Sequence, residues 1–164
     1  MGFWEDTLPG YKGYKEREES RDTDKLLREF LTGQLKEARN RYDDVKLGLT
    51  RGSLDLLDPA EKVTQTLSRV TDRLRYANYG FSGTWFGKDK IDVDRLENVH
   101  RFDQQLAKQV AQIATQIKAL EGQGNEGQIR SGLATLAGTI RDLDEALNER
   151  ERILRTVGGN PVSI

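Results

Sequence analysis

Apolar residues recur at alternating steps of four and three through the last part of the chain. The positions are Ile129, Leu133, Leu136, Ile140, Leu143, Leu147, Leu154 and Val157. A step of seven after Leu147 leaves one position of the repeat to a charged residue, Arg150. This spacing puts all these residues on one face of an α-helix, which must be buried against partner helices. The pattern therefore predicts a long amphipathic helix over residues 126–157.

Three further segments carry a stripe of the same periodicity. The stripe predicted for a helix over residues 20–51 is Leu27, Leu31, Leu35, Ala38, Tyr42, Val45 and Leu49. A helix over residues 58–79 has Val63, Leu67, Val70, Leu74 and Ala77. A helix over residues 93–122 has Leu96, Val99, Asp103, Leu106, Val110, Ile113, Ile117 and Leu120, with the row Ala107, Ala111 and Ala114 beside it. Small residues in that row would let a neighbouring helix approach closely.

The boundaries of these segments carry helix-capping and helix-breaking residues. Asp58, Asp94 and Asn125 each stand where a side-chain oxygen can accept hydrogen bonds from the first turn of a helix. Short turns join the first helix to the second and the third to the fourth, so each pair should form an antiparallel hairpin. The sequence predicts an all-α, elongated, antiparallel four-helix bundle over residues 19–158. An N-terminal arm, 1–18, and a C-terminal tail, 159–164, lie outside it.

Two charged residues interrupt the apolar stripes, Asp103 in the third helix and Arg150 in the fourth. Folding the hairpin about Gly124 places them about one helical turn apart, a distance that an arginine side chain can span. One interpretation is a buried ion pair that fixes the register of the two helices. The other is that Arg150 extends to the surface while Asp103 sits at the edge of the stripe. The sequence leaves both open.

Composition excludes several classes of protein. Apolar residues make up 35% and charged residues 32%, which suits helices that each bury a single stripe. The 26 basic and 27 acidic side chains give a net charge of −1, so no overall field attracts nucleic acid, which is not expected as a partner. The chain has no cysteine, no apolar stretch near the ~18 residues of a membrane span and no secretory signal, so we expect a cytoplasmic protein.

Aromatic residues gather outside the predicted helices. In an up-down-up-down bundle the arm, the 79–91 loop and the C-terminal tail meet at one end. The predicted partner-binding residues, which together form an aromatic pole, are Phe3, Trp4, Tyr79, Phe81, Trp85 and Phe86. Aromatic side chains on glycine-rich irregular backbone are typical of recognition surfaces. The alternative is that they pack on one another and close that end of the bundle.

The remaining candidates indicate no catalytic or metal site. His100 is the single histidine of the chain. A di-iron bundle needs two Glu-x-x-His pairs, and one histidine can complete only one of them. Arg69, Arg73 and Arg75 form a basic run that either is solvated or binds nucleic acid or anionic head groups. Trp85-Phe86-Gly87 resembles the Trp-x-Gly turn of the small helical-hairpin proteins of type VII secretion. The Tyr-x-x-x-Asp/Glu signal of those proteins is missing after the third helix, so we assign no family.

These observations favour a non-enzymatic helical scaffold or adaptor that engages a protein partner through the aromatic pole. A peripheral membrane protein anchored by the Phe3-Trp4 arm is the alternative, and an enzyme or metal-binding bundle is a second one. No cofactor is expected. Self-association of the chain stays open.

Overall fold

The computed structural model describes residues 17–76 and 93–157, with side-chain surroundings for residues 26–49, 51–76 and 101–152. These residues form the helices α2 (Arg17–Thr50), α3 (Leu57–Tyr76), α5 (Val93–Glu121) and α6 (Glu126–Val157), with a short 3-10 helix η1 (Leu54–Leu56) before α3. No strand occurs among them. The predicted all-α four-helix fold is therefore confirmed, with helix starts within three residues of the predicted ones.

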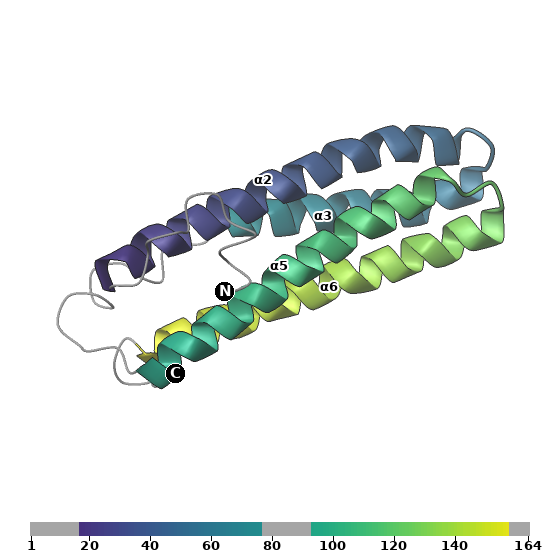
Figure 1. Cartoon of the computed structure of the whole chain (residues 1–164). Helices are drawn as coiled ribbons and strands as arrows, with labels where there is room; N and C mark the ends of the chain where they lie inside the picture. Colours follow the sequence, from purple (N-terminus) through teal and green to yellow (C-terminus); the bar gives the residue numbers. More distant parts are fainter. Residues whose placement is uncertain (1–16, 77–92, 158–164) are drawn as a thin grey trace.

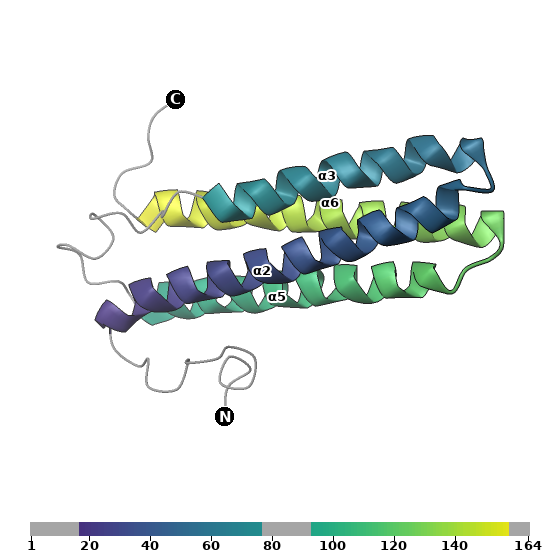
Figure 2. The same cartoon turned by 90° about the horizontal axis from the view of Figure 1, so that it is seen from above.

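The helices pack as two antiparallel hairpins laid side by side (Figure 1). One hairpin is α2 with α3, and the other is α5 with α6. The hairpins meet through α2 against α5 and α3 against α6, and both of these pairs run parallel (Figures 1 and 2). Consequently α3 and α5, which are consecutive helices of the described chain, lie diagonally across the bundle. Each helix thus has one antiparallel and one parallel neighbour.

Both hairpin turns lie at the same end of the molecule, which we call the turn end (Figure 2). At this end the Asn125 Oδ1 accepts hydrogen bonds from the backbone N–H groups of Gly127 and Gln128, at 2.8 and 3.2 Å. Asn125 therefore caps α6, as its position in the sequence predicts. The Ser53 hydroxyl bonds to the Glu126 carboxylate at 3.1 Å, which links the two turns directly.

The predicted stripes form one continuous hydrophobic core. Leu35, Leu67, Ile113 and Leu136, one from each helix, are among its fully buried members. Every stripe residue whose surroundings are described is buried, except Leu49, which is partly exposed. Burial of the four apolar stripes in this core is the main free-energy gain that holds the helices together.

The structure corrects three local predictions. Ala107 is buried, but Ala111 is exposed, so the alanine row is not a close-packing face. The helix α3 begins at Leu57, so Asp58 lies inside the first turn and is not the N-cap. The expected loop before α3 contains η1, whose Leu56 is buried. This leucine helps to explain the start, because inserting it into the core holds the chain in a helical turn before Asp58.

Candidate functional site

The aromatic residues proposed from the sequence as a partner-binding surface lie outside the described residues. They are Phe3, Trp4, Tyr79, Phe81, Trp85 and Phe86. The described helices do fix where the segments that carry them are attached. Arg17, Tyr76, Val93 and Val157 are the helix ends from which these segments and the C-terminal tail continue. All four lie on the side away from the turn end, but α3 stops well short of the other three helices, so Tyr76 is set back from the other three ends (Figures 1 and 2). We call this side the tail end of the bundle.

The described residue closest to the aromatic loop in sequence is itself an exposed aromatic. Tyr76, the last residue of α3, has 69% of its surface exposed. The guanidinium carbon of Arg75 lies 5.2 Å from the centre of its ring, within the range of a cation–π contact. An exposed, cation-stacked tyrosine makes an amphipathic surface at the tail end, able to contact either an apolar or a polar group.

The two charged residues of the core stripes contact each other. The Arg150 Nε donates to the Asp103 Oδ1 at 2.9 Å, and only 8% and 7% of the two side chains are exposed. This is the geometry of the buried ion-pair interpretation and not of an arginine extended to solvent. A buried pair contributes little net stability, because desolvation offsets most of the attraction, but it disfavours any other register of α5 against α6. Its role is structural.

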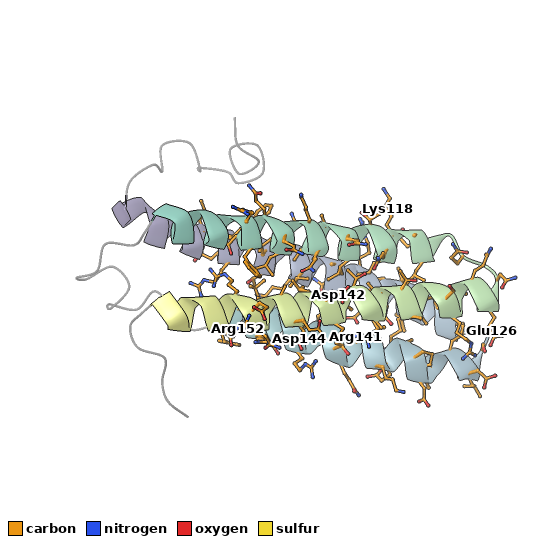
Figure 3. All side chains as sticks on the ribbon, turned by 90° about the horizontal axis from the view of Figure 1, so that it is seen from below. Lys118, Glu126, Arg141, Asp142, Asp144 and Arg152 are labelled. Atoms are coloured by element: carbon orange, nitrogen blue, oxygen red, sulfur yellow. The ribbon has the colours of Figure 1, made fainter. Side chains whose placement is uncertain are left out.

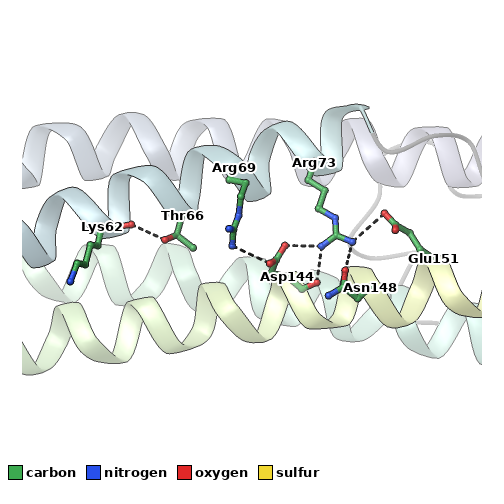
Figure 4. Close-up of polar contacts among 7 residues, drawn as sticks. All are labelled: Lys62, Thr66, Arg69, Arg73, Asp144, Asn148 and Glu151. Carbon is green, nitrogen blue, oxygen red and sulfur yellow. Dashed lines mark hydrogen bonds and ion pairs between the residues drawn. The ribbon is translucent and has the colours of Figure 1, made fainter.

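The basic run of α3 is tied to α6 through a second polar cluster (Figure 4). Arg73 donates to the Asp144 carboxylate at 2.8 Å and to the Asp144 backbone carbonyl at 3.1 Å. Arg69 reaches the other oxygen of that carboxylate at 3.2 Å. Arg73 also donates to the Asn148 side-chain oxygen and forms an ion pair with Glu151. The run is therefore neither solvated throughout nor available as a whole for a nucleic acid or a membrane.

Electrostatics in this cluster favour its charged state. Partial burial alone would lower the pKa of the Arg73 guanidinium, but the hydrogen bonds and charges of Asp144 and Glu151 outweigh it, so the pKa is raised. The sequence analysis missed these acidic partners. A signal was present, since Asp144, Asn148 and Glu151 recur at helical spacing on α6. Without the ring order of the helices, nothing in the sequence pairs that face with Arg73.

A third polar group joins α2 to α3 near the turn end. The Tyr42 hydroxyl, on a fully buried side chain, donates to the Ala60 carbonyl oxygen at 2.6 Å. Burial raises the pKa of this phenol, and the carboxylates of Glu61 and Asp43 raise it further. Lys46 donates to Glu61 at 2.6 Å and to the Thr64 hydroxyl at 3.1 Å. These contacts stabilise the hairpin and form no reactive pair.

The described part of the chain offers neither a metal site nor a membrane-spanning helix. Residues 17–76 and 93–157 contain no group of three or more His, Asp or Glu side chains placed to hold a metal ion. The side chain of His100 lies outside the described residues. No helix within those ranges has the length and apolarity needed to cross a membrane. Exposed charged residues such as Lys118, Arg141 and Arg152 lie along the outer sides of α5 and α6 (Figure 3).

Comparison of this chain with known protein families, with curated proteins and with solved structures finds no match.

Proposed function

We propose that this protein is a non-enzymatic helical scaffold or adaptor, which engages a protein partner through the aromatic residues of segments 1–16 and 77–92. The observation that carries the proposal is the placement of the helix ends. Arg17, Tyr76 and Val93, to which these two segments are attached, all belong to the half of the bundle away from the turn end, with Tyr76 set back because α3 is the shortest of the four helices. The six aromatic residues named above, among the eight in these segments, are thereby attached to the same half of the bundle.

The described helices support the proposal because their own apolar stripes form a continuous buried core. The stripes of the four helices supply the buried leucine, isoleucine and valine side chains, and Tyr42 is the one aromatic among the fully buried described residues. Aromatic side chains that a core does not use are costly to leave in water, and at interfaces they carry binding energy out of proportion to their number. A rigid rod with such a tethered group suits a protein that holds a partner at a fixed distance.

The test replaces Trp85 and Phe86 by serine and measures both binding and stability. Partners are captured from native lysate with the full chain, and the capture is repeated with the double variant. A matched control variant replaces Tyr42 by phenylalanine, a change inside the bundle and away from the tail end. We expect the Trp85→Ser/Phe86→Ser variant to lose capture of specific proteins while its melting temperature stays close to that of the parent chain.

The opposite result would identify a structural plug. In that case the double variant would lose more than ~3 kcal/mol of unfolding free energy, as truncation of core aromatics does, and the folded fraction would still capture the same partners. Flotation with liposomes is run in parallel. Flotation that depends on Phe3 and Trp4, without capture of any protein, would favour the peripheral-membrane alternative over the adaptor.

A further inference from the structure

A small pocket opens between α2 and α3 near the tail end. Its volume is about 340 Å³. The lining consists of one face of α2 and a single residue of α3, namely Arg28, Glu29, Thr32, Gly33, Lys36 and Arg75. Spacing of four residues along α2 brings Arg28, Thr32 and Lys36 onto that face, and Arg75 faces them from the last turn of α3.

The lining carries an excess of positive charge, with three basic side chains against the single carboxylate of Glu29. Arg69 and Arg73 on the same helix α3 are held by Asp144 of α6. Arg75 differs from them. Within the described residues, no carboxylate lies within ion-pair distance of Arg75 or of Lys36, and both are exposed to solvent. These two cations are therefore available to a ligand.

The floor of the pocket adds a hydroxyl group that the fold itself does not use. Thr32 is buried, with 8% of its surface exposed. Across the described part of the chain its hydroxyl has no recorded hydrogen bond, whereas the buried Thr71 hydroxyl bonds back to Leu67 at 2.7 Å. Because Thr32 lines the pocket, its hydroxyl can form a hydrogen bond with a ligand atom there. Beside it Gly33 leaves open space where a larger residue would place a Cβ.

We propose that this pocket binds a phosphate monoester. The Arg75 guanidinium, the Lys36 ammonium group and the Thr32 hydroxyl supply donors from both helices to a group that has three terminal acceptor oxygens. The two exposed cations, Lys36 and Arg75, match the charge of a phosphate dianion. The volume exceeds that of phosphate alone, so part of an organic substituent fits inside. That substituent belongs either to a phospholipid head group at a membrane surface or to a soluble phosphate compound.

The first measurement uses inorganic phosphate as the probe. Backbone amide resonances of the full chain are followed by NMR during titration with phosphate, with ionic strength held constant by chloride to keep general screening unchanged. We expect saturable shifts at Thr32, Gly33 and Lys36. The double variant Lys36→Gln/Arg75→Gln, which alters two exposed side chains, should bind phosphate about tenfold or more weakly, the loss typical of removing charge-assisted hydrogen bonds.

A charge-matched control separates this pocket from general attraction. Lys62→Gln/Lys118→Gln removes two exposed lysines elsewhere on the bundle and should leave the phosphate affinity unchanged. Phosphatidylcholine vesicles containing phosphatidic acid, whose head group is a phosphate monoester, are compared with vesicles containing phosphatidylserine. A preference for phosphatidic acid that requires Lys36 and Arg75 would identify a lipid ligand. Phosphate binding without that preference would identify a soluble one.

Two results would overturn the inference. One is the absence both of saturable shifts with phosphate and of a preference for phosphatidic acid. The other is an equal loss of binding in the two double variants, which would show attraction by overall charge. The inference is independent of the proposed partner binding, because Trp85→Ser/Phe86→Ser leaves the pocket residues unchanged. If Trp85→Ser/Phe86→Ser abolishes partner capture but the parent chain shows no saturable phosphate binding, only the pocket inference fails. If phosphate binds at the pocket but partner capture survives the double change, only the adaptor proposal fails.

Discussion

Arg150 of α6 and Asp103 of α5 form a hydrogen-bonded ion pair inside the core, although 47 residues separate them in sequence. The pair replaces apolar residues at one position of each stripe. Around it the stripe residues Leu106 and Leu147 are buried, so both charges are held in a largely apolar environment. A core built this way is sensitive to the loss of one partner and tolerant of the loss of both.

Replacing Asp103 by alanine should therefore destabilise the bundle by about 3–5 kcal/mol, because it leaves the Arg150 charge buried without this carboxylate. Replacing Asp103 by leucine and Arg150 by methionine together should recover most of that loss. Urea unfolding of Asp103→Leu, of Arg150→Met and of the double variant completes a mutant cycle. If the effects of the single changes simply add in the double variant, the two residues are not energetically coupled.

Core truncation tests the stripes at mid-height of the bundle. Leu136→Ala and Ile113→Ala each remove a side chain that is fully buried. Each change should cost roughly 2–5 kcal/mol, since it loses transfer free energy and leaves a cavity. The control is Leu47→Ala on α2, where 62% of the leucine is exposed. Thermal and urea unfolding should show a much smaller loss for the control, and equal losses would contradict the assignment of the core.

The sequence predicts the helices and the core of this protein because both depend on local periodicity. A residue such as Leu136 or Ile113 is marked as buried by its neighbours three and four positions away, whichever helix covers it. The cap at Asn125 is predicted for the same reason, since a capping side chain bonds only to its own helix. Asp58 shows the limit of such reasoning. The buried Leu56 of η1 moves the start of α3 ahead of the residue best suited to cap it.

The order of the helices around the bundle is beyond the reach of that reasoning. An apolar stripe indicates that one face of a helix is buried, but it does not indicate which helix covers that face. The sequence predicts alternating directions correctly, yet it does not reveal that α3 and α5 lie diagonally and that α3 packs beside α6. For this reason the cluster of Arg73 with Asp144 could not be assembled from the sequence, whereas the pocket of Arg28 with Arg75 lies within the predicted hairpin of α2 and α3 and needed the rotation of each helix about its axis. Each joins residues of two helices.

The Arg73–Asp144 contact should contribute to stability in a salt-dependent way. Asp144 accepts hydrogen bonds from both Arg69 and Arg73, and about a fifth of its side chain is exposed. Asp144→Ala should cost about 1–3 kcal/mol, the range for hydrogen bonds to charged groups. The matched control is Glu145→Ala, an exposed position one residue along α6, which should change stability by less than about 0.5 kcal/mol.

Added salt distinguishes the ionic part of this contact from its packing. Unfolding by urea is measured for the parent chain and for Asp144→Ala at low and high salt. The difference in unfolding free energy between the parent chain and Asp144→Ala should shrink as the salt concentration rises, because these partly exposed charges are screened. A difference that stays constant with salt would mean that Asp144 acts through its neutral contacts alone.

Ionisation of the Tyr42 phenol should lower the stability of the fold in alkaline solution. Its hydroxyl donates to the Ala60 carbonyl, and the pKa of the buried phenol is raised above its ordinary value of about 10. The folded state therefore keeps the proton at pH values where the unfolded chain releases it. The contribution of this group to stability is complete below pH about 10 and falls above it, by up to about 1.4 kcal/mol per pH unit, until the folded-state pKa is reached.

Tyr42→Phe removes both the hydrogen bond and the titration. At neutral pH the variant should be less stable than the parent chain by about 0.5–1.5 kcal/mol, the net value of such a bond. Above pH about 10 this gap in unfolding free energy between the parent chain and Tyr42→Phe should narrow, because only the parent chain loses stability through this phenol. Urea unfolding at neutral pH and at pH about 11 measures the gap, with Tyr76→Phe, an exposed phenol on α3, as the control. A gap that is constant with pH would show that Tyr42 ionises equally in both states, and that burial against Ala60 does not hold its proton.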